Sequence, residues 1–301
     1  MHKVFKILLV LLALWLTSSA IAMFFFADGT VIGEQIAVIP ITGVLTLDGG
    51  SMFFQQTLSA EEIVFQIQDA QQNSAVKGIV LEINSPGGTV LGSKKIADAV
   101  DEVTEKPVVA IITEQGTSGA YWVASQADVV VADPLSLVGS IGVIGSYLEF
   151  GGLLSDYNVS YQRLVIGEYK DITSPYREMT DAEEALLLER LQGVHEYMVK
   201  DIAEGRGLTI AETSEIANGL FYLGQDALEL GLVDELGDTD DAIAIVRALA
   251  GISGGQVTEY EKEETIFDVL KQYLAYSSFY MGQGIGTAIL SVEQDAWDIR
   301  V

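Results

Sequence analysis

From about residue 35 onward, short runs of apolar and mostly β-branched residues alternate with segments whose apolar positions recur at helical spacing. This alternation is typical of βαβ units, in which helices join parallel strands. Strands buried on both faces are nearly continuous runs of Val and Ile. The sequence therefore predicts an α/β fold with a mainly parallel sheet, and the predicted strands are 36–45, 78–83, 108–113, 129–132 and 161–166.

Two predicted helices begin at capping sequences. Segments 59–62 (Ser-Ala-Glu-Glu) and 180–183 (Thr-Asp-Ala-Glu) place a hydroxyl three residues before a glutamate, the spacing of a capping box. We expect the second helix to run to about Glu204 and to end at Gly205. Other helices are expected from near Val90, from about 119 to 125, and as shorter pieces across 209–250, with turns at Asn218-Gly219 and Gly237-Asp238.

The N-terminal segment predicts a membrane anchor, residues 1–27. Residues 7–26 form an uncharged run of 20, close to the length that a helix needs to cross a bilayer core. Lysines precede the run and acidic residues follow it, so the positive-inside tendency places the main domain outside the cytoplasm. The chain is then a single-pass protein of the cell membrane. A cleavable signal peptide is the alternative, because Ala20-Ile21-Ala22 has the small-x-small pattern of a cleavage site.

The composition changes again after the predicted globular domain, residues 35–253. Residues 254–301 contain a Gly-Gly-Gln segment, an acidic stretch and then apolar residues at helical spacing, namely Ile266, Val269, Leu270, Tyr273 and Leu274. We interpret this part as a C-terminal extension with an amphipathic helix. Its acidity favours packing on the domain or on a sister subunit over packing on lipid.

Charge and composition exclude several classes of chemistry. The net charge of −27 repels nucleic acid, so no nucleic-acid partner is expected. The absence of cysteine excludes disulfides and thiolate nucleophiles, and two histidines cannot build a multi-histidine metal site within one chain. Catalysis would therefore use hydroxyls, lysines or carboxylates, and no cofactor or metal is expected.

Two glycine-containing loops follow predicted strands. In 84–88 (Asn-Ser-Pro-Gly-Gly), paired glycines can present backbone N–H groups to an anion, as an oxyanion hole does, although Gly-Gly alone is more typical of an ordinary turn. In 116–120 (Gly-Thr-Ser-Gly-Ala), Ser118 would occupy a sharp strand-to-helix elbow that suits a nucleophile. An isolated serine at this place is more often a helix N-cap.

A serine nucleophile needs a base, and the sequence offers few. His195 lies in a charged helical pattern and is better interpreted as a surface or boundary residue. A lysine serves as base only when its amine is neutral, which requires burial or neighbouring positive charge. Lys170 follows a predicted strand in a glycine-bearing loop, but beside Glu168 and Asp171 a lysine is usually a solvated surface charge.

The motifs in these loops carry a resemblance to a known family. Residues 78–88, 117–122, 138–143, 169–171 and 177–180 resemble signal peptide peptidases of the SppA type, serine proteases of peptidase family S49 with a ClpP/crotonase-like fold. The resemblance spans about residues 35–250. It implies a peptidase that degrades remnant signal peptides or similar hydrophobic peptides through an acyl-enzyme.

The same resemblance implies roles for individual residues. Ser118 would be the nucleophile, Lys170 the general base, and Gly87 and Gly88 the oxyanion donors; the cleft would be bordered by Gly119, Gly139, Ser140, Ile141, Gly142 and Val143. It also implies a ring- or bowl-shaped homo-oligomer in which serine and lysine come from different subunits. Ala120 departs from the family, which commonly has glycine there, and its methyl group is expected to narrow the site. Two rivals remain, namely an acyl-CoA hydratase or isomerase of the same superfamily and a catalytically inactive membrane scaffold.

Overall fold

The computed structural model describes residues 11–12, 14–18, 33–52, 55–260, 277–278, 280–281 and 283. Most of the predicted anchor and the predicted amphipathic helix over 266–274 lie outside the described residues. Among the described residues, no helix is long and apolar enough to cross a membrane. The chain divides into a unit of residues 1–260 and a second unit of residues 261–301.

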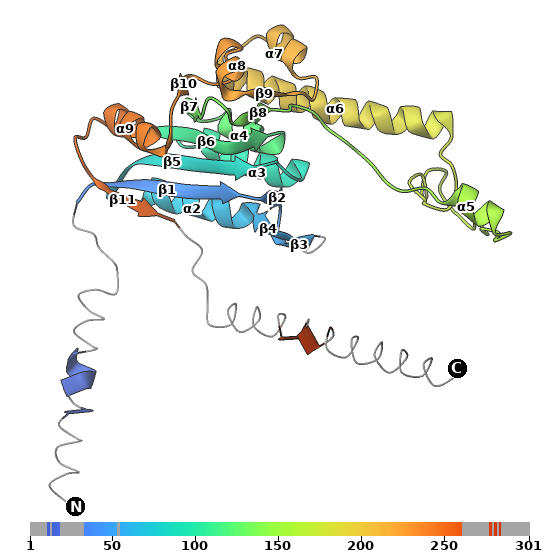
Figure 1. Ribbon diagram of the computed structural model, residues 1–301, viewed down its shortest axis with the longest axis horizontal. Coiled ribbons are helices and arrows are strands. Elements are labelled where there is room, and N and C mark those ends of the chain that lie inside the picture. Colours follow the sequence, from blue (N-terminus) through green and yellow to red (C-terminus); the bar gives the residue numbers. More distant parts are fainter. Residues whose placement is uncertain are drawn as a thin grey trace, which may run out of the picture. The chain divides into compact units, whose positions relative to one another are not determined.

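A mainly parallel eight-stranded sheet forms the centre of this unit (Figure 1). Its main path has the order β10-β7-β6-β5-β1-β11, in which every neighbouring pair is parallel, while β8 pairs parallel with β6 and β9 pairs antiparallel with β8. The predicted α/β class with a mainly parallel sheet is confirmed. The bounds are β1 Gln35–Thr42, β5 Val76–Ser85, β6 Val108–Thr117, β7 Val129–Ala132, β8 Leu137–Gly139, β9 Phe221–Leu223, β10 Glu235–Leu236 and β11 Gln256–Glu259.

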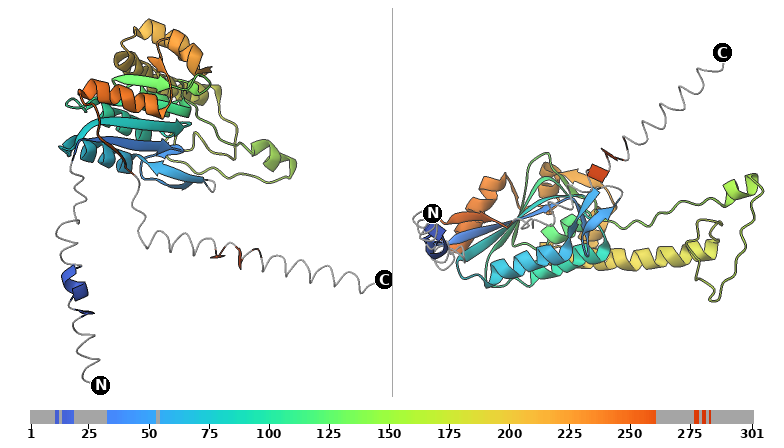
Figure 2. Two further views of the ribbon diagram at one scale, coloured as in Figure 1. Left: turned by 60° about the vertical axis from the view of Figure 1, so that its left-hand side comes forward. Right: turned by 90° about the horizontal axis from the view of Figure 1, so that it is seen from below.

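Alternate side chains of the central strands enter two different apolar layers. Ile36 and Val38 of β1 pack in one cluster with Ala242 and Val246 of helix α9 (Thr239–Ala250). The intervening β1 side chains belong to the larger cluster, which includes helices α2 (Ala60–Gln72), α3 (Val90–Asp101) and α4 (Gly119–Ala124). The helices therefore cover both faces of the sheet, as a parallel sheet requires (Figure 2).

A small second sheet lies beside the start of helix α2. It contains β2 (Val44–Thr46), β4 (Gln55–Ser59) and β3 (Gly50–Met52), in that order. The single strand predicted over 36–45 is thus two strands. The break falls at Gly43, whose φ of 92° lies in the left-handed region that favours glycine.

The long helix α6 (Asp181–Arg206) begins as predicted and ends two residues later than predicted. The Thr180–Glu183 capping box is present, which confirms the predicted start. The C-cap is Gly207, with φ of 62°, and not Gly205. Gly205 is a glycine for another reason, since a Cβ atom there would lie 2.3 Å from the carbonyl oxygen of Ser125. The glycine at position 205 therefore lets α6 pack closely against the backbone at Ser125.

The predicted strand 161–166 is wrong. These residues lie in a long excursion, residues 144–180, that we call the arm; it carries the short helix α5 (Gly151–Asp156) and projects from the sheet (Figure 1). Leu164 and Ile166 are 96% and 99% exposed. The β-branched and apolar residues that predicted a buried strand have no neighbouring strand in the described part of this protomer.

The C-terminal part of the unit extends past the predicted boundary at residue 253. The predicted shorter helices are present as α7 (Ile210–Ile216), α8 (Gly224–Glu229) and α9. After α9 the chain returns to the sheet, where Gln256 of β11 pairs with Gln35 of β1. The first residues of the predicted extension therefore complete the sheet.

Candidate active site

Ser118 lies at a strained elbow between β6 and α4. Its φ of 54° and ψ of −124° are unusual for a residue with a side chain. The backbone is held there by two hydrogen bonds: the Ser118 N–H donates to the carbonyl oxygen of Gly139 (2.7 Å), and the Trp122 N–H donates to that of Ser118 (3.1 Å). Ser118 occupies the N-cap position of α4, but its side chain makes no capping hydrogen bond. The hydroxyl is therefore not used as the helix cap that an isolated serine would suggest.

The glycine pair after β5 presents one free amide rather than two. The Gly87 N–H donates to Ser85 Oγ (3.1 Å), and Ser85 Oγ in turn donates to the carbonyl oxygen of Gly43 (2.6 Å). The Leu45 N–H donates to the Gly87 carbonyl oxygen, and the Thr89 N–H donates to the Leu45 carbonyl oxygen. The N–H of Gly88, which lies between them, has no partner among the described residues. The prediction that Gly87 donates to an oxyanion does not fit this bonding, whereas Gly88 fits.

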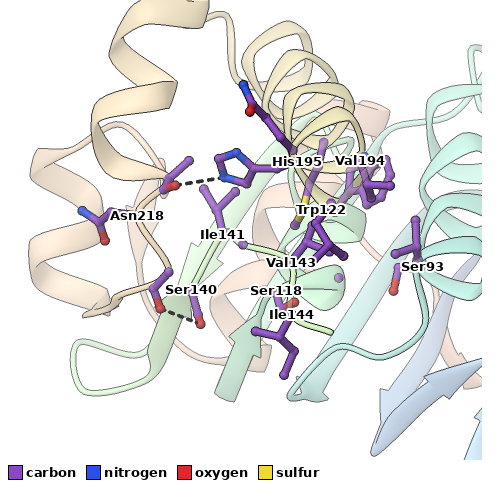
Figure 3. A pocket seen from close by; sticks show the side chains of 18 of the residues that line it. Ser93, Ser118, Trp122, Ser140, Ile141, Val143, Ile144, Val194, His195 and Asn218 are labelled. Atoms are coloured by element: carbon purple, nitrogen blue, oxygen red, sulfur yellow. Dashed lines mark hydrogen bonds between the residues drawn. The ribbon is translucent and has the colours of Figure 1, made fainter. Parts of the chain in front are cut away.

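A pocket of about 800 Å³ opens beside Ser118 (Figure 3). Of the predicted site residues, the following line it: Gly88, Ser118, Gly119, Ser140, Ile141, Gly142 and Val143. Gly87 and Gly139 do not line the pocket but support it, since Gly87 adjoins Gly88 and the Gly139 carbonyl holds Ser118. Most of the predicted site residues therefore lie around one pocket of a single protomer.

Ser140 fixes the loop on the side of the pocket away from β5. Its φ is 48°, its N–H donates to the carbonyl oxygen of Leu220 (2.9 Å), and its hydroxyl donates to that of Gly219 (3.1 Å). The Gly219 N–H donates back to the carbonyl oxygen of Ile141 (3.1 Å). Three hydrogen bonds therefore join segment 140–141 to the loop between α7 and β9.

A second wall of the pocket comes from one face of α6, a contribution that the sequence did not predict. Leu188, Leu191, His195 and Met198 line the pocket. Their spacing of three, four and three residues is that of one helical face, and charged neighbours in the sequence obscured this signal. His195 is a half-buried boundary residue, as predicted, and its Nε2 lies 3.0 Å from the carbonyl oxygen of Ala217. Because a carbonyl only accepts, that nitrogen carries a hydrogen.

Ala120 lies away from the pocket. Its side chain is fully buried in the main apolar cluster, and it is not among the residues that line the pocket. The expectation that its methyl group narrows the site is therefore wrong. The methyl group adds to the core behind the elbow instead.

Lys170 lies on the arm and is exposed. Its backbone N–H donates to the carbonyl oxygen of Gly167 (3.1 Å), and its side chain is not among those that line the Ser118 pocket. The described protomer therefore does not bring Lys170 and Ser118 into one pocket.

The acidic neighbour of Lys170 is held by an ion-pair cluster. Asp171 pairs with Arg163 (2.7 Å) and with Arg177 (3.3 Å), and Arg177 also pairs with Glu183 at the start of α6 (2.7 Å). Hydrogen bonds from Arg163 and then Arg177 hold the pKa of Asp171 well below its usual range. The hydrogen bonds from Arg177 and the Thr180 backbone lower the pKa of Glu183 to about 2. The cluster thus ties the arm to α6 and satisfies the Asp171 carboxylate.

We expect this cluster to loosen in acid. A carboxylate whose folded pKa is lowered stabilises the fold above its unfolded pKa of about 4, and this contribution is lost as the pH falls toward the folded value. For Glu183 the loss spans about pH 4 to 2. Replacing Arg177 with Gln should produce the same loosening at neutral pH, and we expect chymotrypsin to cleave the arm roughly five- to tenfold faster.

The matched control is Arg190→Gln, because Arg190 of α6 also pairs with a glutamate, Glu189, but this ion pair is exposed on both sides. This variant should be cleaved at the wild-type rate. Equal cleavage of the Arg177→Gln variant and the wild type would show that the cluster does not hold the arm.

Sequence comparisons match this chain to protease families and to proteins named as proteases. The sequence model of peptidase family S49 matches residues 101–253, and that of Clp protease matches residues 50–132. A putative protease of Methanocaldococcus jannaschii is 35% identical over 98% of this chain and 97% of its own length. The putative signal peptide peptidase SppA of Enterococcus faecium is 30% identical over 78% of this chain and 69% of its own length. Protease 4 of Salmonella typhi is 32% identical over 79% of this chain, which spans 38% of that longer protein.

The parallel sheet with helices on both faces fits the ClpP-like fold. The family match covers the elbow, the arm and α6, which are the parts of the chain that carry the candidate site. The chain belongs to peptidase family S49 and is a serine peptidase of the SppA type.

Proposed function

We propose that this serine peptidase is a membrane-anchored endopeptidase that cleaves remnant signal peptides or similar hydrophobic peptides, with Ser118 as nucleophile and Lys170 as general base. The observation that carries the proposal is an uncapped serine hydroxyl at a strained elbow beside a largely apolar pocket. Strain of this kind concentrates at functional sites.

The proposed reaction forms and hydrolyses an acyl-enzyme. Ser118 Oγ attacks the peptide carbonyl, its proton passes to the neutral amine of Lys170, and the amine leaving group takes that proton as the C–N bond breaks. A water molecule then hydrolyses the ester. The amides of Gly88 and Gly119 are suited to the oxyanion: the first has no partner among the described residues, and the second follows the nucleophile directly.

Two features support a dyad shared between subunits. Lys170 is exposed on the arm and absent from the Ser118 pocket of its own protomer. The arm also exposes many large apolar side chains, which a soluble surface rarely tolerates in one place and which a second copy of the chain would cover. They include Ile144, Leu148, Leu153, Tyr157, Val159, Leu164 and Ile166. A ring- or bowl-shaped homo-oligomer would bring the arm of one protomer to the pocket of the next.

The pocket walls favour apolar substrate side chains. Trp122, Ile141, Leu191 and Met198 line the pocket without a formal charge. The uncharged run over residues 7–26 would anchor the enzyme in the cell membrane with its catalytic unit outside the cytoplasm, where remnant signal peptides arise. One relative is named for this substrate class.

A charge placed in the pocket tests this substrate preference. We expect Leu191→Asp to lower kcat/KM for an apolar fluorogenic peptide by about 10- to 100-fold, because the carboxylate would lose its hydration when the substrate binds. The control is Leu249→Asp, since Leu249 is exposed on α9, which packs on the other face of the sheet from α4. The proposal for the substrate class would fail if wild-type enzyme cleaved a peptide with a charged residue before the scissile bond as well as it cleaves the apolar peptide.

A further inference from the structure

Ser93 has a buried hydroxyl that the proposed mechanism does not use. The residue lies in α3 and is fully buried, and its Oγ has no hydrogen-bond partner among the described residues. Its side chain nevertheless lines the Ser118 pocket. A buried hydroxyl without a partner destabilises a fold, so such groups are few and call for an explanation.

The hydroxyl lies next to the groups proposed to bind the oxyanion. A Cβ atom at position 119 would stand 2.0 Å from Ser93 Oγ and 3.5 Å from the backbone nitrogen of Gly88. The backbone nitrogen of Gly119 is bonded to the same Cα atom that would carry this Cβ atom. Ser93 Oγ and the amide nitrogens of Gly88 and Gly119 therefore lie close together, and only glycine at position 119 permits this, because a Cβ atom there would overlap the Ser93 side chain.

The view of the pocket agrees with this arrangement. In Figure 3, Ser118 lies between Ser93, which comes from α3, and His195, which comes from α6. Ser93 therefore approaches the nucleophile from the helix that follows the glycine loop after β5, since α3 begins at Val90.

We propose that the Ser93 hydroxyl is a third oxyanion donor, which hydrogen-bonds the negatively charged oxygen of the tetrahedral intermediate together with the amides of Gly88 and Gly119. This inference rests on the proposed function of Ser118. It makes Ser93 a catalytic residue, because its hydroxyl contacts a reacting atom.

The step balances without a further reactant. When Ser118 Oγ bonds to the carbonyl carbon, the π electrons move to the carbonyl oxygen, and the proton of Ser118 goes to the base. The resulting oxyanion has three lone pairs, so it can accept from two amides and one hydroxyl. Ser93 keeps its proton throughout, and its hydrogen bond weakens again when the carbonyl reforms and the C–N bond breaks. Such donors stabilise the transition state more than the substrate.

Thermal stability distinguishes a catalytic role of the Ser93 hydroxyl from a purely structural one. Ser93→Ala keeps the Cβ atom that packs against Gly119 and removes only the unpaired hydroxyl. Because an unsatisfied buried hydroxyl destabilises the fold, its removal should leave Tm unchanged or raise it. Ser136 is the matched control: it is also buried, but its hydroxyl lies within hydrogen-bond distance of two carbonyl oxygens, those of Ile112 (3.0 Å) and Asp133 (2.8 Å), and can donate its one hydrogen to either. Ser136→Ala should lower Tm and leave activity unchanged.

The test compares full-length wild type, Ser93→Ala, Ser136→Ala and Ser118→Ala in detergent with an apolar fluorogenic peptide. For Ser93→Ala we expect kcat to fall about 10- to 100-fold with KM within about twofold, because the lost hydrogen bond forms mainly in the transition state. Inhibition by a peptide boronate, whose adduct with a serine mimics the oxyanion, should weaken by a similar factor. Binding of the uncleaved peptide should be equal in Ser118→Ala and in the Ser118→Ala, Ser93→Ala double variant.

The outcomes separate this inference from the proposal on which it rests. Wild-type kcat in Ser93→Ala, with Ser118→Ala inactive, would overturn the role of Ser93 and leave the nucleophile intact. Activity of Ser118→Ala equal to that of the wild type would overturn the proposed function itself. A parallel fall of kcat and Tm in Ser93→Ala would also overturn the inference, because it would assign the hydroxyl to folding.

Discussion

Replacing Ser118 with alanine should lower kcat by about 10⁴- to 10⁶-fold and abolish labelling by a serine-reactive phosphonate. The physical reason is that the variant keeps the pocket and the oxyanion amides but lacks the atom that forms the acyl-enzyme. The measurement is hydrolysis of an apolar fluorogenic peptide in detergent, followed by mass spectrometry of the phosphonate-treated protein.

A second substitution at this position separates catalysis from strain. Ser118→Gly should be equally inactive, yet its Tm should rise by about 2 °C or more, because glycine adopts the left-handed φ of Ser118 without steric conflict. The gain is reduced by the larger conformational freedom of glycine in the unfolded chain.

The control for both variants is Ser125→Ala. Ser125 is the C-cap of the same short helix, and its buried hydroxyl donates to the carbonyl oxygen of Trp122 (2.8 Å). This variant should lose some stability and keep its activity. Phosphonate labelling of the Ser118→Ala protein at another serine, with turnover retained, would contradict the assignment of the nucleophile.

The parallel sheet could be predicted because its strands are buried on both faces. Continuous Val- and Ile-rich runs mark β5, β6 and β7, and the structure has strands at all three places. The same signal failed at 161–166, where apolar residues are on the arm and exposed. Hydrophobicity alone does not tell whether the covering surface belongs to the same chain, so a segment that suits an interface between subunits resembles a buried strand.

The glycines show a similar limit. Sequence predicts that a glycine is needed but not what approaches it. Gly205 suggested a helix end and instead permits contact with Ser125, while the helix ends at Gly207. In the glycine pair, Gly88 and not Gly87 is free to donate, because the Gly87 N–H already donates to the hydroxyl of Ser85. Such choices are made by side chains that only the fold brings together.

Only part of the candidate site could be predicted from the sequence, for the same reason. The elbow at Ser118 could be predicted because strand, small residues and helix are consecutive in the sequence. The contribution of α6 could not, because His195 and Met198 reach the pocket from a helix far along the chain. Lys170 was selected by family resemblance alone, and its exposed position explains why no local pattern identified it.

Lys170→Ala should be nearly as inactive as Ser118→Ala, with kcat lowered by about 10³-fold or more, because no other base is proposed for the serine proton. The matched control is Lys200→Ala, since Lys200 is an exposed lysine of α6 that pairs with Glu204 (3.5 Å). That variant should keep wild-type activity. Full activity in Lys170→Ala would remove this lysine from the mechanism.

Mixing the two inactive variants tests whether the dyad is shared between subunits. If Ser118 of one protomer uses Lys170 of its neighbour, random co-assembly of Ser118→Ala and Lys170→Ala chains restores a complete pair at about a quarter of the sites, since each partner is intact half of the time. Two different affinity tags on the co-expressed chains verify that mixed oligomers form, and the recovered activity should depend on both tags. Mixed oligomers without activity would mean that serine and lysine act within one chain, which would require the arm to fold back toward its own pocket. The exposed apolar side chains of the arm argue for the first outcome, because a neighbouring protomer can cover them while it receives the lysine.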